Sequence, residues 1–279
     1  MIASHRLAVL VDSCLLPSVS SPRLPEWVLR GLERGTPGAA VHGDGPSARA
    51  ATEALRAALP DALAARQRQA GTVPPRAGGR SDTSTPANRS GVAAGRSMGA
   101  AAAAELVASG ANLHLSVRPD PRPGRTGAFV TGLQSHGVAA ALGPFTGAGD
   151  LAPFAEAAAA GVRAVTADVP SALREPVVAR GLRGDLGYRG VVVSDALDAP
   201  LIVAGWGVPG AAVLAWIAGV DLIRLGPGIG SGVREAVHAA AARAVADGDL
   251  RMARLEEAAD RVARLRRWAS EPRMPAVSG

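Results

Sequence analysis

A carboxylate at the end of a buried strand is the most chemically informative feature of this sequence. The apolar run GVVVS is followed directly by Asp195, and Asp198 lies three residues further on. In a (β/α) barrel the carboxyl ends of the strands face the active site, where an aspartate can be a nucleophile, a base or a metal ligand. The same placement suits a helix N-cap for Asp195. Asp198 has two alternative roles: it can compensate the dipole of the following helix, or it can form a metal-binding carboxylate pair with Asp195.

A glycine-rich segment, RLGPGIGSGVREA (224–236), is the second candidate. Its pattern predicts a strand, a loop and a helix, and N–H groups at a helix start can hold a phosphate or another anion. It matches no P-loop motif, and the chain contains no lysine. Two interpretations stay open: a tight turn, or a phosphate-binding barrel that uses arginine and backbone donors.

The elements that must position these residues alternate along the chain. Candidate strands are LAVLV (7–11), GAAVH (38–42), ALAAR (62–66), NLHLSV (112–117), VAAAL (138–142), VRAVTA (162–167), GVVVSD (190–195) and DLIRL (221–225). Candidate helices cover 47–59, 93–110, 149–161, 171–187, 207–219, 231–248 and 250–268. Continuous apolar strands between helices predict an α/β fold with a buried parallel sheet, either a barrel or a doubly wound sheet.

The length of 279 residues fits one barrel, so we expect a single domain over 1–279 that ends with the helix 250–268. Residues 66–91 are rich in Gly, Pro, Ser, Thr and Arg, which predicts a flexible loop, either an insertion or a lid.

Composition limits the partners and the location. The net charge is +6, but the arginines are interleaved with acidic residues and form no cluster, so we expect no nucleic-acid partner. Cys14 is the only cysteine, which excludes an internal disulfide and favours a reducing compartment. The run 7–11 is too short for a signal peptide, and we expect no stretch of about 18 apolar residues that spans a membrane. A cytoplasmic location is therefore expected.

Residues 182–226 (LRGDLGYRGVVVSDALDAPLI followed by AAVLAWIAGVDLIRLG) resemble the end of the glycoside hydrolase family 3 N-terminal domain. Segments 95–120 and 126–167 and the start of the chain are also similar to it, whereas 66–91 matches poorly. The resemblance implies a TIM-type (β/α)8 barrel, with room for distortion or shortening. It also implies a retaining glycosidase of carbohydrate metabolism, acting on O-glycosyl bonds of a small β-N-acetylhexosaminide or β-glucoside, with no metal and no cofactor.

In that family the position of Asp195 holds the catalytic nucleophile, and the resemblance places Asp120, Phe145 and Asp150 at the substrate. The chain departs from the family elsewhere. Where the family has a Lys-His-Phe-Pro-Gly-His-Gly motif, residues 143–149 are GPFTGAG, and the loop with the acid/base Asp-His pair is absent. The family's acidic sugar-binding motif falls near RQRQAG (66–71), which has no carboxylate.

These departures bear on mechanism, because retaining hydrolysis needs a nucleophile and an acid/base about 5–5.5 Å apart. Possible substitutes for the acid/base are Asp120, Asp150, His42, His114 and His136. The resemblance therefore implies a hydrolase of weak or no activity. The alternatives are a non-catalytic sugar-binding or interaction pseudoenzyme, and the phosphate-binding barrel described above.

Overall fold

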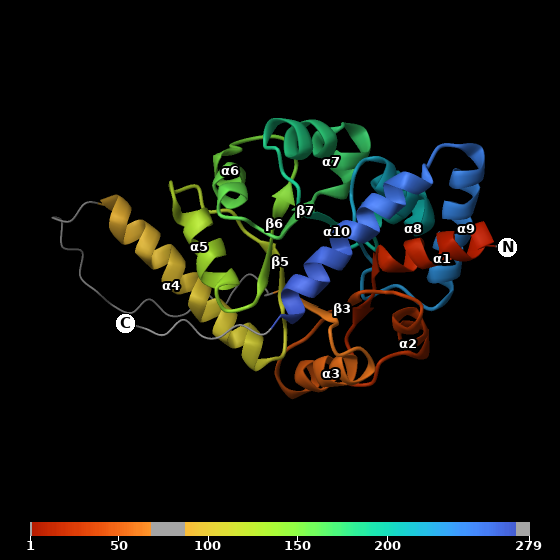
Figure 1. Ribbon diagram of the computed structural model, residues 1–279, viewed down its shortest axis with the longest axis horizontal. Coiled ribbons are helices and arrows are strands. Elements are labelled where there is room, and N and C mark those ends of the chain that lie inside the picture. The colour runs from red at the N-terminus through yellow and green to blue at the C-terminus, as the bar shows by residue number, and fades with distance from the viewer. Residues whose placement is uncertain (1, 68–86, 272–279) are drawn as a thin grey trace.

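The computed structural model describes residues 2–67 and 87–271, and its centre is a ring of parallel strands (Figure 1). A seven-stranded sheet follows chain order: β2 (Ser18–Val19), β3 (Gly38–Val41), β4 (Leu63–Arg66), β5 (Leu113–Val117), β6 (Ala139–Phe145), β7 (Ala164–Ala167) and β8 (Val191–Ser194). Just before β2, β1 (Leu15–Leu16) pairs with β9 (Ile223–Arg224), and a parallel bridge joins Val193 of β8 to Leu222. The first strand thereby meets the last, and the expected (β/α)8 barrel is confirmed.

Helices surround this ring in the order expected for such a barrel (Figure 1). They are α1 (Ile2–Ser13), α2 (Glu26–Glu33), α3 (Gly45–Ala58), α4 (Ala87–Ala108), α5 (Arg125–Gln134), α6 (Ala152–Ala159), α7 (Val169–Arg174), the π-helical segment η1 (Val178–Asp185), α8 (Pro200–Ile217), α9 (Gly232–Asp247) and α10 (Met252–Ser270). Helix α10 crosses one end of the ring, and its Val262 and Leu265 pack with the residues inside the barrel.

The barrel interior is filled by small and branched aliphatic side chains. Its members include Leu63, Leu113, Leu115, Val191, Val193 and Leu222, together with several alanines. Two fully buried aromatic side chains, Trp216 and Phe145, lie instead in the layer between the strands and the helices. A chain with only 3% aromatic residues thus packs its core with Ala, Val and Leu.

The strand predictions are confirmed for seven of the eight segments, and one is wrong. Residues 7–11 lie within α1, and the first strand is formed by the following residues, 15–19. A short apolar run does not distinguish a buried strand from part of a helix, which explains the error. The predicted helix 171–187 is divided into α7 and η1 near Pro176, where Glu175 is extended, as is usual before a proline.

Besides α1, two further helices, α2 and α5, were not predicted. Helix α5 contains glycines, which have low helix propensity. These glycines are required by packing: a Cβ on Gly132 would lie 2.1 Å from the Arg96 carbonyl oxygen of α4, and one on Gly99 of α4 would lie 2.2 Å from the Phe129 oxygen of α5. Close helix packing here outweighs local propensity. Most of the predicted loop 66–91 (residues 68–86) lies outside the described residues, and α4 already begins at Ala87.

Helix α8 corrects the expectation that the chain has no apolar stretch of about 18 residues. It is 18 residues long and, by length and composition alone, apolar enough to cross a membrane. Its backbone is interrupted at Gly207, which is not helical and has φ of 65°. Seven of its residues are buried, and Trp216 is fully covered, so α8 is packed as a core helix of this barrel.

Candidate functional site

Two aspartates lie side by side where adjacent strands end. Asp168 follows β7 and Asp195 follows β8, and the Asp195 N–H donates to the Ala167 carbonyl oxygen at 3.1 Å. Burial, and after it the negative charge of Asp168, raise the pKa of Asp195 to about 6 against the opposing charge of Arg224. The sequence-predicted nucleophile is therefore a partly desolvated carboxylate beside a second carboxylate and a cation.

Arg224 supplies that cation from β9. Its side chain is only 6% exposed, and its Nη1 donates to Gln67 Oε1 at 2.8 Å. Its Nε is buried and makes no hydrogen bond within the described part of the chain. Burial lowers the pKa of Arg224, and the charges of Asp195 and Asp198 raise it. A buried donor without a partner is costly, so an oxygen of a bound ligand is a favourable acceptor for this group.

His42 lies after β3 at the same end of the barrel. One ring nitrogen, Nε2, is 3.0 Å from Ser18 Oγ, with the donor set by the tautomer. Burial lowers the pKa of His42, and the positive charge of Arg224 lowers it further, whereas Asp198 raises it. A neutral imidazole bonded to a serine is therefore favoured here at neutral pH.

The glycine-rich loop is packed on Asp198. The Gly228 N–H donates to Asp198 Oδ2 at 3.0 Å, and a Cβ on Gly226 would lie 1.7 Å from Asp198 Oδ1. The expected anion position in 224–236 is thus filled by the protein's own carboxylate, which corrects the interpretation of this loop as a phosphate site. The same contact explains why Asp198 precedes α8 without capping it, since the N-cap is Ala199.

Asp120 follows β5 but is held within its own loop. Its carboxylate accepts hydrogen bonds from Arg122 Nε and Nη2 at 2.9 and 2.7 Å, and Arg125 Nε is 3.4 Å away. These hydrogen bonds from Arg122 lower the pKa of Asp120. Within the described residues no hydrogen bond or ion pair connects Asp120 with Asp195, so the two predicted site residues lie in separate networks.

The other two predicted substrate contacts have structural roles. Phe145 is fully buried, and its ring packs edge-to-face on Phe154 of α6 with centroids 4.9 Å apart. The side chain points into the helix layer, which corrects the expectation of a sugar contact. Asp150 is exposed, and its Oδ1 accepts a hydrogen bond from the Ala152 N–H at 2.9 Å at the start of α6.

The two remaining histidine candidates lie against backbone carbonyl groups, and Asp168 is bonded to Ser171. His114 is buried in β5 with Nδ1 3.0 Å from the Leu115 oxygen, and His136 Nδ1 lies 3.0 Å from the Gly132 oxygen after α5. Asp168 is the N-cap of α7, and its Oδ2 accepts hydrogen bonds from both the N–H and the hydroxyl of Ser171. None of these described groups is arranged as a proton donor toward Asp195.

Asp168, Arg224 and Gln67 were not proposed as site residues from the sequence. The strand-end rule that identified Asp195 applies equally to Asp168 after VRAVTA and to Arg224 in DLIRL. Applying it to every predicted strand identifies both. Gln67 carries no such signal, because its role depends on its contact with Arg224 across the ring.

Comparison with known proteins supports the resemblance. Residues 148–265 match the family model described as "Glycosyl hydrolase family 3 N terminal domain". Among curated proteins, none matches the sequence.

Several solved structures share the fold. A family 3 β-N-acetylglucosaminidase from Paenibacillus sp. str. FPU-7 has 23% identity and a TM-score of 0.72, and the similarity covers 97% of this chain and 64% of that one. A β-N-acetylhexosaminidase from Beutenbergia cavernae DSM 12333 has 22% identity and a TM-score of 0.72, with 93% and 98% covered. A fungal multi-domain family 3 β-N-acetylglucosaminidase has 20% identity and a TM-score of 0.75, with 94% and 39% covered.

The chain therefore spans less than two thirds of two of these relatives and nearly all of the third. The family match lies in the part of the chain that holds Asp168, Asp195 and Arg224. The sequence match to the family 3 N-terminal domain model thus covers residues 148–265, less than half of the chain, and the barrel as a whole shares the fold of these solved structures.

Proposed function

We propose that this chain is a family 3 barrel that binds a β-N-acetylhexosaminide or β-glucoside and hydrolyses it slowly. The proposed site is the end of the barrel at which Asp195 lies, which we call the mouth. The observation that carries the proposal is the position of Asp195, half-buried after β8 between Asp168 and Arg224. The names of the similar structures, which are β-N-acetylglucosaminidases and a β-N-acetylhexosaminidase, favour an amino sugar.

The proposed reaction begins with the Asp195 carboxylate. One of its oxygens bonds to the anomeric carbon as the bond to the leaving oxygen breaks, and water then hydrolyses the glycosyl ester and restores the carboxylate. Arg224 stabilises the ionised form of Asp195 before attack and offers its buried Nε to a ligand oxygen. With no proton donor arranged among the described residues, the leaving group departs as an anion and takes its proton from solvent.

This mechanism predicts a steep dependence on the leaving group. General acid catalysis contributes about 10²–10⁴-fold in rate, and it matters little when the leaving group is already a stable anion. We expect 2,4-dinitrophenyl β-N-acetylglucosaminide to be cleaved, the 4-nitrophenyl analogue to be cleaved far more slowly, and the methyl glycoside not detectably. Asp195→Asn should abolish all turnover, whereas Asp249→Asn, at an exposed position on another loop, serves as the matched control.

Two results contradict parts of the proposal. Cleavage of the methyl glycoside at a rate near that of the dinitrophenyl compound means that an acid is present. Asp168→Asn then tests whether the carboxylate beside Asp195 is that acid. Failure of folded protein both to cleave and to bind N-acetylglucosaminides, measured by calorimetry, contradicts sugar binding at this mouth.

If binding is found without turnover, the chain is the pseudoenzyme that the missing motifs suggest. We also propose a single domain over 1–279 and a cytoplasmic location. The location is supported by Cys14, the only cysteine, which is free and fully buried, as suits a reducing compartment.

A further inference from the structure

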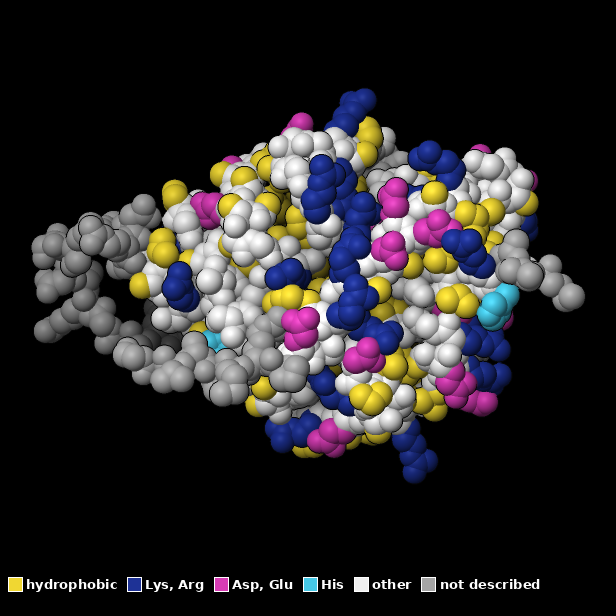
Figure 2. All heavy atoms as spheres, viewed as in Figure 1, with side chains coloured by type: hydrophobic (Ala, Val, Ile, Leu, Met, Phe, Trp, Pro, Cys, Tyr) yellow, Lys and Arg dark blue, Asp and Glu magenta, His cyan; other side chains and the backbone are white. Residues whose placement is uncertain are grey.

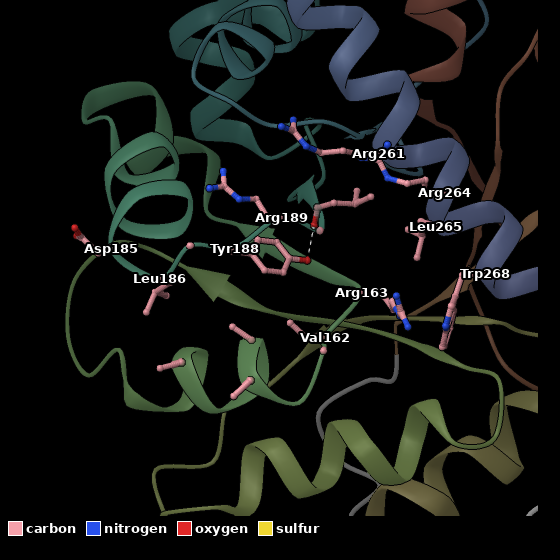
Figure 3. A pocket seen from close by; sticks show the side chains of 17 residues that line it. Val162, Arg163, Asp185, Leu186, Tyr188, Arg189, Arg261, Arg264, Leu265 and Trp268 are labelled. Atoms are coloured by element: carbon pink, nitrogen blue, oxygen red, sulfur yellow. Dashed lines mark hydrogen bonds between the residues drawn. The ribbon is translucent and has the colours of Figure 1, made fainter.

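A pocket lies at the other end of the barrel from Asp195. This pocket has a volume of about 740 Å³ and is bordered by α6, η1 and α10 (Figure 3). Its lining includes Arg163 and Arg189, which directly precede β7 and the Gly190 that leads into β8. Since Asp168 and Asp195 follow the same strands, about 13 Å of strand separates the two sites. Because of this separation, a ligand bound in the pocket does not block the mouth at Asp195.

The lining of the pocket is strongly cationic. Four arginines, Arg163, Arg189, Arg261 and Arg264, surround it, and Asp185 is the one acidic residue among the lining positions (Figure 3). Arginine side chains also gather in a band across this face of the molecule (Figure 2). A concave surface with one sign of charge concentrates ions of the opposite sign.

Neighbouring carboxylates neutralise these charges only in part. Within the described residues, Arg189 and Arg264 make no ion pair, and Arg163 is stacked 4.7 Å over the ring of Trp268. Arg261 donates to the buried Asp221 and lies 3.7 Å from Glu257, but both carboxylates also contact Arg254, and Asp221 contacts Arg183 as well. Behind the pocket, two carboxylates therefore face three arginines.

The rest of the wall is apolar and well defined. Tyr188 lines the pocket, and its side chain is held in place because it is only 5% exposed and its hydroxyl donates to the Val191 carbonyl oxygen at 3.2 Å (Figure 3). Val162, Leu186 and Leu265 lie beside it. Concave sites of this size, with apolar walls and a few convergent charged groups, are typical of small-molecule binding.

We propose that this pocket binds a phosphorylated small molecule. The guanidinium groups of Arg189 and Arg264 lie on different sides of the pocket (Figure 3), and both side chains are exposed and free to turn toward a bound phosphate. The planar fork of arginine matches phosphate oxygens and stays charged. The apolar body of the ligand lies on the Tyr188 ring and the stacked Arg163–Trp268 pair. This ligand class differs from the neutral glycoside proposed for the barrel mouth.

The test uses calorimetric titration of the full chain with adenosine diphosphate, inorganic pyrophosphate and adenosine. We expect saturable binding of adenosine diphosphate and no binding of adenosine. In the double variant Arg189→Ala/Arg264→Ala, the affinity should fall at least about tenfold, as two charge-assisted hydrogen bonds are lost. Neither arginine has a structural partner among the described residues, so this variant should fold normally, which circular dichroism checks.

Arg267→Ala is the matched control, because it removes an exposed arginine of the same helix that does not line the pocket. It should leave the affinity unchanged, and so should Asp195→Asn at the mouth. Equal affinity in the double variant and the wild type, equal losses in the double variant and Arg267→Ala, or no saturable binding of either phosphorylated probe overturns the proposal. Weaker binding in Asp195→Asn places the ligand at the mouth instead and equally overturns it.

Discussion

Replacing Asp221 with asparagine will lower the free energy of unfolding by about 3–5 kcal/mol, the range for breaking a buried ionic network. Asp221 is fully buried, and its carboxylate accepts hydrogen bonds from Arg183 and Arg254 at 2.7 Å each and from Arg261 at 3.0 Å. It also accepts from the Val192 N–H at 2.9 Å. Removing its charge leaves three largely buried arginines that repel one another, with only the exposed Glu257 as a remaining anion near two of them.

Urea unfolding at pH 7 measures this effect. Asp185→Asn is the matched control, because Asp185 is exposed and should change stability by no more than about 0.5 kcal/mol. Arg261→Gln removes one of three cations and leaves the carboxylate paired, so we expect a smaller loss than for Asp221→Asn. A loss below about 1 kcal/mol in Asp221→Asn contradicts the role assigned to this network.

Replacing Asp195 with asparagine will stabilise the protein at neutral and alkaline pH. The folded-state pKa of Asp195 is raised from 3.8 to about 6, chiefly by burial. A raised pKa means that the folded state binds the proton more tightly, so the contribution of this group to stability is greatest below pH 3.8 and is lost as pH rises through 6. A difference of about two pKa units corresponds to roughly 3 kcal/mol, and solvent access reduces it to about 1–3 kcal/mol.

The pH dependence separates this effect from an ordinary surface mutation. We expect Asp195→Asn to exceed the wild type in free energy of unfolding at pH 8 and to approach it near pH 4. Asp249→Asn, exposed and far from the mouth, should show no such difference. A variant that is less stable than the wild type at pH 8 shows that the carboxylate is stabilising in the folded state, against the proposed desolvation.

The fold was largely predictable because its strands are continuous apolar runs separated by alanine-rich helices. Prediction failed where local signals were ambiguous or overridden. Residues 7–11 are apolar in both a strand and a helix, and only pairing of β1 with β9 identifies 15–19 as the first strand. In α5 the glycines that argue against a helix are the residues that let α4 approach.

Of the residues at the site, only Asp195 was predictable from the sequence. Asp195 is identified by its position after a strand and by the resemblance, but its partners come from other strands. Phe145 shows the limit of position alone, since it ends β6 yet its side chain is directed into the helix layer. The Asp221 network joins arginines from 183 to 261, and no local pattern in the sequence indicates such a cluster.

Closure of the ring by β1 and β9 has a consequence for biosynthesis. Leu15 pairs with Ile223, more than 200 residues later in the chain. At the usual rate of translation, roughly 10–40 s pass between the synthesis of these two residues. Throughout that interval the growing sheet has two open edges, which can pair with other nascent chains. The yield of folded protein in a cell should therefore depend on chaperones that shield these edges until the ribosome has delivered β9.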